Sequence, residues 1–229
     1  MTEERDYIYF MGVCGTGMGS LAGLVKSLGF KVAGSDEHVY PPMSTQLEEW
    51  GIEIKKGFRP ENLEPRPDRI VVGNVIREVN PEAQAMREAG IPHLSMPEAI
   101  AEFGIGEKHC IVVAGTHGKT TTTALTAHLL RSAGRDPSFL VGGVLVDYPT
   151  SFNVGSGDTF VIEGDEYDTA YFDKGPKFRH YRPSTALISS LEFDHADIFT
   201  GLEDIENAFA KLVDATAPTG RLVVWKKAE

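Results

Sequence analysis

Residues 110–123 read Cys-Ile-Val-Val-Ala-Gly-Thr-His-Gly-Lys-Thr-Thr-Thr-Thr, and this stretch determines the fold of the second half of the chain. Its first five residues are apolar and predict a buried strand, followed by a glycine turn and a helix through about Ser132. Gly-Lys-Thr in this context is typical of a P-loop, whose amides surround nucleotide phosphates. In such a loop Lys119 reaches the terminal phosphates and the Thr120 hydroxyl binds Mg²⁺. The strict pattern requires a glycine where Val113 stands, so the context fits a P-loop and the spacing departs from it.

A second glycine turn lies near the N-terminus, between the apolar run 7–13 and a helix whose apolar face ends at Gly29. The order of strand, glycine turn and helix suits a diphosphate held on a helix N-terminus. Asp36, at the end of the next strand, is placed where such folds contact a ribose or a base. The spacing G-x-x-G-x-G-x-G from Gly12 does not match the G-x-G-x-x-G fingerprint. A turn that only allows close packing of helix on strand is therefore the alternative.

Strands and helices alternate along the whole chain, which predicts an α/β fold with parallel, doubly wound sheets. The length of 229 residues corresponds to roughly one and a half domains. Because each glycine turn would begin its own sheet, we predict two domains, 1–105 and 106–229, with a boundary where Gly104 and Gly106 loosen the chain. The further elements are strands at 31–34, 52–55, 69–73, 159–163, 185–190 and 221–225, and helices at 81–89 and 202–213.

Composition narrows the class of protein. The chain has 22 Lys and Arg against 33 Asp and Glu, a net charge of −11, which argues against a nucleic-acid binder held by general electrostatics. No apolar run approaches the length of a membrane span, and the polar, acidic N-terminus differs from a signal peptide. Two cysteines, Cys14 and Cys110, form no disulfide framework or zinc pattern. We therefore expect a cytoplasmic protein without membrane or nucleic-acid partners.

Two polar clusters follow the predicted strands of the second half. Glu163-Gly-Asp165-Glu166-Tyr-Asp168 places four carboxylates within six residues; it is either a solvated acidic turn or, with Glu163 facing the P-loop, a Mg²⁺ ligand. Asp194-His195 follows the strand that ends near Ser190. A histidine beside an aspartate is most often hydrogen-bonded within the protein, and in a phosphoryl-transfer site it is able to hold a second metal.

Together, these motifs resemble the Mur ligases of bacterial cell-wall synthesis. The resemblance rests on Gly115-Thr-His-Gly-Lys-Thr-Thr121, on Glu163-Gly-Asp-Glu166 and on Glu192-Phe-Asp-His-Ala-Asp197, which occur in the family's order. In that family GT-x-GK-T replaces the strict P-loop spacing, and the first glycine turn looks like the turn that binds UDP. Tyr40–Ser44 and Glu163–Lys174 look like the branch of the family that accepts a recycled peptide, whereas the branch that adds L-alanine continues differently at both places.

The resemblance implies ATP-dependent amide formation in peptidoglycan recycling, with ATP and Mg²⁺ as cofactors. The lactyl carboxylate of UDP-N-acetylmuramate would become an acyl phosphate, and the amine of L-alanyl-γ-D-glutamyl-meso-diaminopimelate would displace phosphate. It also implies a Rossmann-like UDP-binding domain followed by the first part of a P-loop ATPase domain. Because the family has three domains, we expect a fragment that lacks the peptide-binding part and is inactive alone.

Site residues are carried over by motif position. The resemblance implies that Lys119, Glu163 and His195 are catalytic. The metal ligands would be Thr120 and Glu163 for a first Mg²⁺ and His195 for a second. The ATP phosphates would contact Gly115, Thr116, His117, Gly118, Lys119, Thr120 and Thr121. UDP-N-acetylmuramate would contact Gly15, Thr16, Gly17 and Met18 through its diphosphate, Asp36 through its uracil or ribose, and Asn74 through its sugar.

Three other functions remain open at this stage. A UDP-N-acetylmuramate–L-alanine ligase would share both nucleotide sites and differ in the amine that releases phosphate from ATP. An NAD-dependent oxidoreductase would explain the first glycine turn and leave the second unexplained. A non-catalytic module that binds a UDP-sugar would need only the first domain.

Overall fold

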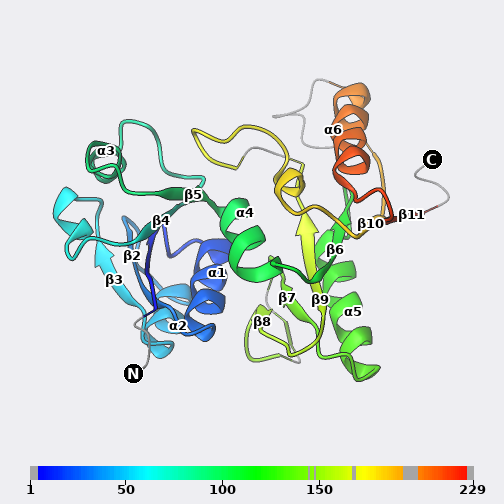
Figure 1. The fold of residues 1–229 in the computed structure, drawn as a ribbon, viewed down its shortest axis with the longest axis horizontal. Helices are drawn as coiled ribbons and strands as arrows, with labels where there is room; N and C mark the ends of the chain where they lie inside the picture. Colours follow the sequence, from blue (N-terminus) through cyan, green and yellow to red (C-terminus); the bar gives the residue numbers. More distant parts are fainter. Residues whose placement is uncertain (1–4, 144, 147, 167–168, 193–200, 226–229) are drawn as a thin grey trace. The chain divides into compact units, whose positions relative to one another are not determined.

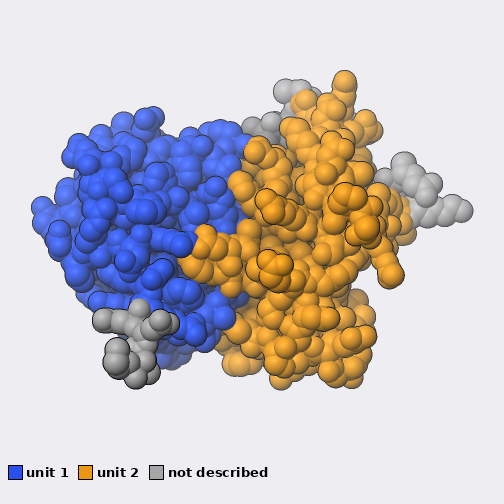
Figure 2. Space-filling view, in the orientation of Figure 1, with its two compact units in different colours: residues 1–99, 169–174 blue, residues 100–168, 175–229 orange. Residues whose placement is uncertain are grey.

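The computed structural model describes residues 5–143, 145–146, 148–166, 169–192 and 201–225. The chain forms two compact units (Figure 1, Figure 2). The N-terminal unit comprises residues 1–99 and 169–174, and the C-terminal unit comprises residues 100–168 and 175–229. Within the described ranges, no helix has both the length and the apolar character that a bilayer crossing requires.

The N-terminal unit is built on a parallel sheet, which in the described part of the chain has five strands in the order β3-β2-β1-β4-β5. Because β2 and β4 flank β1, the direction of chain progression reverses at β1, and such reversal points bind ligands at the carboxyl ends of the strands. The elements are β1 (Tyr7–Met11), α1 (Thr16–Ser27), β2 (Lys31–Asp36), α2 (Met43–Glu49), β3 (Glu53–Lys56), the 3-10 helix η1 (Pro60–Leu63), β4 (Arg69–Val72), α3 (Pro81–Glu88), β5 (His93–Ser95) and α4 (Met96–Ala99).

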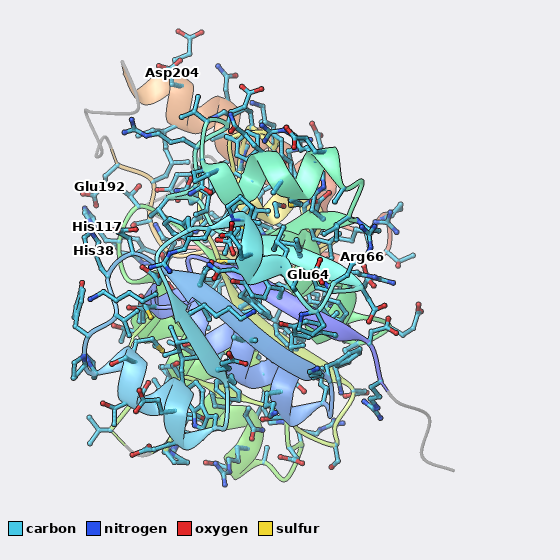
Figure 3. All side chains as sticks on the ribbon, turned by 90° about the vertical axis from the view of Figure 1, so that its left-hand side faces the viewer. His38, Glu64, Arg66, His117, Glu192 and Asp204 are labelled. Atoms are coloured by element: carbon cyan, nitrogen blue, oxygen red, sulfur yellow. The ribbon has the colours of Figure 1, made fainter. Side chains whose placement is uncertain are left out.

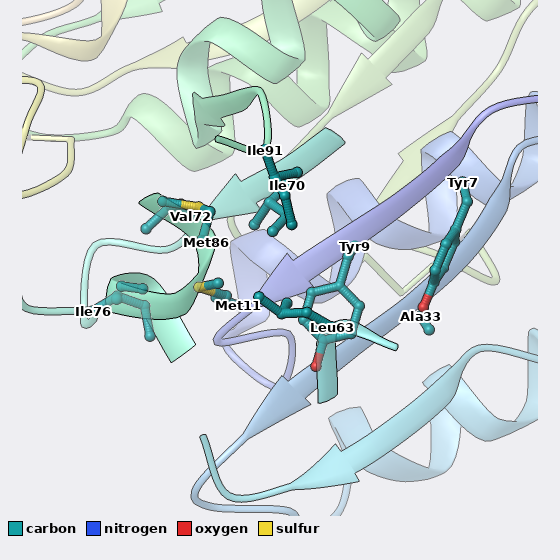
Figure 4. Close-up of a cluster of buried hydrophobic side chains, with 11 residues drawn as sticks. Tyr7, Tyr9, Met11, Ala33, Leu63, Ile70, Val72, Ile76, Met86 and Ile91 are labelled. Atoms are coloured by element: carbon teal, nitrogen blue, oxygen red, sulfur yellow. The ribbon is translucent and has the colours of Figure 1, made fainter. Parts of the chain in front are cut away.

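The core of this unit lies on both faces of the sheet. Every residue of β1 is buried, as expected for a central parallel strand covered on two sides. Side chains alternate along a strand, so Tyr7, Tyr9 and Met11 share one face, where they pack with residues of η1 and α3 (Figure 4). Position 34 next to β1 requires a glycine, because a Cβ there would lie 2.6 Å from the Phe10 carbonyl oxygen.

The C-terminal unit contains a second sheet with the order β11-β10-β6-β9-β7-β8 among the described residues, in which every pairing is parallel except that of β7 with β8. Helix α5 packs against β6 and β9, and α6 against η3. The elements are the π-helical segment η2 (Ile100–Ile105), β6 (His109–Ala114), α5 (Lys119–Ser132), β7 (Ser138–Leu140), β8 (Phe152–Asn153), β9 (Thr159–Gly164), η3 (Lys177–His180), β10 (Thr185–Ile188), α6 (Leu202–Ala215) and β11 (Arg221–Val224).

The predicted fold class, two parallel α/β sheets each begun by a strand and a glycine turn, is confirmed. The expected loosening at Gly104 is not what the structure shows. Gly104 lies within the helical segment η2, and a Cβ there would lie 2.9 Å from the Phe160 ring. This glycine therefore permits close packing on β9 and does not loosen the chain.

The N-terminal core contains a buried carboxylate that the sequence did not single out. Glu82 is fully buried in the first turn of α3 and accepts hydrogen bonds from the Tyr9 hydroxyl and the Ser35 hydroxyl, each at 2.7 Å. Burial raises the pKa of Glu82 above its usual value, because a charged carboxylate loses its hydration there. The two donated hydrogen bonds oppose this shift in the pKa and join β1, β2 and α3 in one polar cluster.

We predict that Glu82 makes the stability of the N-terminal unit depend on pH. Since the pKa is raised in the folded state, the free energy of unfolding is highest below the unfolded-state pKa and falls as pH rises through the folded-state pKa. Glu82→Gln should flatten this dependence, and Glu82→Ala should cost about 1–3 kcal/mol by leaving buried hydroxyls without a partner. Urea unfolding followed by Trp50 fluorescence in a Trp225→Phe background measures both effects. Glu88→Gln, on an exposed position of α3, is the control, and an equal pH response in both Gln variants would refute the prediction.

Candidate functional site

The first glycine turn is held in place by the neighbouring strand. Gly12, with φ of +82°, and Val13 both donate their backbone N–H groups to the Ser35 carbonyl oxygen at the end of β2 (2.8 and 3.0 Å). A side chain at Gly12 would be strained by the backbone conformation and would meet Val75, 3.2 Å from the Cβ position. The turn is therefore fixed in shape before any ligand binds.

Asp36 completes this turn through its carboxylate. One oxygen accepts the Cys14 backbone N–H and the other accepts the His38 backbone N–H, each at 2.9 Å. The residue predicted to contact a uracil or ribose thus organises the backbone of the turn itself. Burial and the nearby Asp36 charge raise the pKa of the Cys14 thiol to about 11, so that thiol stays protonated at neutral pH.

The turn presents the N-terminus of α1. Gly15 is the N-cap of the helix, and in the described structure no side chain caps it. Gly15 and Thr16 are exposed and Gly17 is partly exposed, whereas the Met18 side chain is buried, which leaves only its backbone for a ligand. Exposed Asn74 follows β4, so the predicted contacts of the N-terminal unit all lie at or just after the carboxyl ends of β1, β2 and β4. A helix N-terminus at such an edge attracts anions.

The second glycine turn connects β6 to α5 and contains two glycines with positive φ. Gly118 is the N-cap of α5 with φ of +78°, and Gly115 has φ of +140°. A side chain at Gly115 would also collide with Ser189, which follows β10. Both glycines are therefore required by the backbone, because larger residues rarely adopt these angles.

Hydrogen bonds from the loop after β10 fix the first half of this turn. The Thr116 hydroxyl donates to the Glu192 carbonyl oxygen (3.0 Å) and accepts the Glu192 backbone N–H (2.9 Å). The Thr116 backbone N–H donates to the Ser190 carbonyl oxygen (3.0 Å), and the Ser190 hydroxyl accepts the His117 backbone N–H (2.9 Å). The exposed His117 ring lies 4.0 Å from the Glu192 carboxylate, and Figure 3 labels the two residues next to each other.

Lys119 begins α5 and points back into the turn. Its ammonium group donates to the Gly115 carbonyl oxygen (2.8 Å) and pairs with the Glu166 carboxylate (3.2 Å). The side chains are 12% and 3% exposed, so this ion pair is largely shielded from water. A phosphate that enters the turn would replace Glu166 as the partner of the Lys119 ammonium, as is expected for a P-loop lysine.

Thr120 and Glu163 meet at the start of α5. The Thr120 hydroxyl donates to one Glu163 oxygen (2.9 Å), and the Gly142 backbone N–H donates to the other (2.6 Å). Two adjacent ligands of an octahedral Mg²⁺, each about 2.0–2.1 Å from the ion, lie about 2.9 Å apart. The hydroxyl and carboxylate oxygens therefore fit a Mg²⁺ that keeps water and phosphate as its other ligands.

The acidic turn is not bare to solvent. Asp165 pairs with Lys177 at 2.7 Å, in addition to the contacts of Glu163 and Glu166.

Lys177 and Ser190 were not predicted as site residues, since no local spacing marks them. Thr121 lies exposed in the first turn of α5. Asp168, Asp194 and the predicted second metal ligand His195 lie outside the described residues, and no cluster of three or more metal-binding side chains occurs among the residues that are described.

Comparison with known families identifies the class of protein. A model described as "Mur ligase family, catalytic domain" matches residues 7–107, and a model of the Mur ligase middle domain matches residues 113–229. The second match alone spans more than half of the chain. The chain therefore belongs to the Mur ligase family.

Individual relatives point to two branches of this family. The chain is 46% identical over 95% of its length to the UDP-N-acetylmuramate–L-alanyl-γ-D-glutamyl-meso-2,6-diaminoheptandioate ligase of Escherichia coli K12, covering 48% of that protein. It is 37% identical over 96% of its length to a UDP-N-acetylmuramate–L-alanine ligase of Syntrophomonas wolfei, covering 45% of it. A solved ligase of the first kind from Neisseria meningitides superposes with a TM-score of 0.91 at 42% identity, covering 97% of this chain and 72% of that one. The chain spans about half the length of the curated relatives it matches.

We predict that Thr116→Val loosens the glycine turn between β6 and α5. Valine has the same shape, yet it leaves the Glu192 amide and carbonyl groups without their shared partner, at a cost of about 1–3 kcal/mol. Hydrogen exchange of the Glu192 amide should therefore accelerate in Thr116→Val. Thr116→Ser keeps the hydroxyl and should exchange at the wild-type rate. Equal acceleration in both variants would mean that the hydroxyl does not hold the turn.

Proposed function

We propose that this chain supplies the UDP-sugar-binding part and most of the phosphate-binding part of an ATP-dependent amide ligase. The observation that carries the proposal is the arrangement of Lys119, Thr120 and Glu163 at one turn of the C-terminal unit. This set provides a cation for phosphate oxygens and two oxygen ligands for Mg²⁺. An NAD-dependent oxidoreductase leaves that arrangement without a purpose.

In the proposed reaction, the carboxylate of UDP-N-acetylmuramate attacks the γ-phosphorus of ATP, ADP leaves, and an acyl phosphate results. An amine then attacks the acyl carbon, phosphate leaves, and an amide bond forms. Amides at 115–118 would hold the phosphates, and Lys119 would neutralise the charge on the transferring group once phosphate displaces Glu166. Mg²⁺, held by Thr120 and Glu163, would neutralise charge on the phosphate oxygens. His195 would be the predicted ligand of a second metal ion.

The N-terminal unit would bind the UDP-N-acetylmuramate. The exposed N-terminus of α1 at Gly15–Gly17 would hold the diphosphate through backbone N–H groups, with the Met18 backbone contributing. Asn74 would contact the sugar. Asp36 would support the nucleotide indirectly by holding the turn in shape. Alternatively, its carboxylate would release one backbone N–H group and accept a hydrogen bond from the ribose or uracil instead.

The amine substrate is proposed to be L-alanyl-γ-D-glutamyl-meso-diaminopimelate, in the recycling of peptidoglycan. Higher identity to the ligase named for this peptide than to the ligases named for L-alanine, 46% against 37%, supports the choice. A UDP-N-acetylmuramate–L-alanine ligase is the second candidate, favoured by the 37% relative. Phosphate release from ATP with each amine distinguishes them in a protein of the relatives' full length.

We predict that Gly15→Ala weakens binding of UDP-N-acetylmuramate to this chain. Among the described atoms beyond its chain neighbours, only the Gly12 carbonyl oxygen lies within 4 Å of the Cβ position, so a methyl group fits the folded chain and occupies the approach of a diphosphate to α1. Calorimetry should give clear binding to wild type and a loss of about tenfold or more, near 1.4 kcal/mol, in the variant. Gly201→Ala is the matched control, because Gly201 is the extended N-cap of α6 and no described atom lies within 4 Å of its Cβ position. Unchanged affinity in Gly15→Ala would remove the α1 N-terminus from the site.

We predict that Glu163→Gln raises the Mg²⁺ concentration needed for ADP binding, because the amide is a poorer metal ligand than a carboxylate. Binding of Mg-nucleotide to this chain should be weak compared with UDP-N-acetylmuramate, so the titration uses a fluorescent ADP analogue at high protein concentration. Asp165→Asn, which removes a carboxylate paired with Lys177 in the same turn, is the control and should leave the Mg²⁺ dependence unchanged. An identical Mg²⁺ dependence in Glu163→Gln and wild type would return Glu163 to a purely structural role.

A further inference from the structure

The Lys119 ammonium is already paired with a carboxylate of its own unit. It lies 3.2 and 3.4 Å from the two oxygens of Glu166, and it donates a hydrogen bond to the Gly115 carbonyl oxygen at 2.8 Å. A carboxylate and a phosphate group offer a lysine the same kind of partner, which is an oxygen that carries negative charge. Glu166 therefore occupies the place beside Lys119 that the oxygen of an incoming phosphate would need.

Burial makes Glu166 a strong competitor for this place. Ion pairs between exposed side chains contribute little, because water and salt screen the two charges. The side chains of Lys119 and Glu166 are only 12% and 3% exposed, so their attraction is screened much less. Separating a buried carboxylate from its cation is costly, and any phosphate that takes over Lys119 has to offset this cost.

The other carboxylates of the acidic turn are held by different groups. Glu163 accepts hydrogen bonds from the Thr120 hydroxyl and the Gly142 backbone N–H. Asp165 pairs with the Lys177 ammonium at 2.7 Å, and its carbonyl oxygen accepts the Lys177 backbone N–H at 3.0 Å. Asp165 thus carries the same charge as Glu166, one position earlier in the chain, and pairs with a different lysine. A substitution at each position separates the effect of pairing with Lys119 from the effect of net charge.

We propose that Glu166 is a built-in competitor of phosphate for Lys119. A phosphate group binds the second glycine turn by exchange, in which its oxygens replace the Glu166 carboxylate at the Lys119 ammonium. Glu166 therefore lowers the affinity of the turn for phosphate groups and keeps the Lys119 charge neutralised in their absence. It acts on the phosphate through Lys119. The proposal rests on the proposed function, which assigns the phosphate-binding role to this turn.

The test is a titration of the isotope-labelled 229-residue chain with inorganic pyrophosphate in metal-free buffer, followed by NMR. The Gly118 amide reports on the second glycine turn, and the Gly17 amide reports on the first. Glu166→Gln keeps the shape of the side chain and removes its charge, so it should tighten pyrophosphate binding at Gly118 about tenfold. A residue that only supported the structure of the turn would give the opposite sign, a loss of affinity.

Asp165→Asn is the matched control, because it removes the same charge from the adjacent position without releasing Lys119 from Glu166. It should leave the affinity at Gly118 within about twofold of wild type, as expected when the charge that competes for Lys119 is intact. The affinity reported by Gly17 should be the same in wild type and in both variants.

A second measurement follows the exchange in the wild-type chain and needs no substitution. The Glu166 Cδ and Lys119 Nζ resonances should move during the titration with the same dissociation constant as the Gly118 amide, because one event changes the partner of both groups.

Three results would each overturn the proposal alone. These are an unchanged or weaker affinity in Glu166→Gln, equal tightening in Glu166→Gln and Asp165→Asn, and a Glu166 Cδ resonance that stays fixed while Gly118 saturates. A Gly118 amide that does not respond to pyrophosphate in wild type or in either variant would instead contradict the phosphate-binding role in the proposed function, and this proposal with it. The two failures are therefore distinguishable.

Discussion

The parallel pairing of β6 with β9 is the interaction on which the turn after β6 depends. In this register Val113 is opposite Glu163 and Ala114 is opposite Gly164, so the carboxylate at the end of one strand reaches the helix that follows the other. A shift of one residue would turn the Glu163 side chain to the opposite face of the sheet. Gly164 contributes to this register, because a Cβ there would lie 2.5 Å from the Val112 side chain.

Both glycine turns are organised in the same way, by groups from the end of an adjacent strand. In the N-terminal unit, the Ser35 carbonyl and the Asp36 carboxylate at the end of β2 hold the amides of the turn after β1. In the C-terminal unit, Ser190 and Glu192 after β10 hold the turn after β6. Such preorganisation lowers the cost of ordering the loop when a ligand binds. It also explains why both turns contain glycines with positive φ, a conformation that other residues rarely adopt.

The residues that could be predicted from the sequence are those whose partners lie within one local motif or at the end of a recognisable strand. Lys119 and Thr120 belong to such a motif, and Glu163 ends a clear apolar run. The partnership of Lys119 with Glu166 joins residues 47 positions apart, and that of Thr116 with Glu192 joins residues 76 apart. These pairs depend on strand order and register, which no local spacing contains. Short elements such as α2 and β5 were also missed, because seven and three residues carry little periodicity.

The course of the chain has a practical consequence for separating its parts. Because the polypeptide passes between the units after residues 99, 168 and 174, no single cut yields two intact halves. A gene fragment ending near residue 105 would encode a Rossmann-like unit with Arg87, His93 and Ser95 deprived of their partners in residues 171–173. The complementary fragment would carry Tyr171 and Phe172 as solvent-facing aromatic rings. Expression of either piece alone therefore risks self-association, because side chains that are packed in the intact chain become exposed.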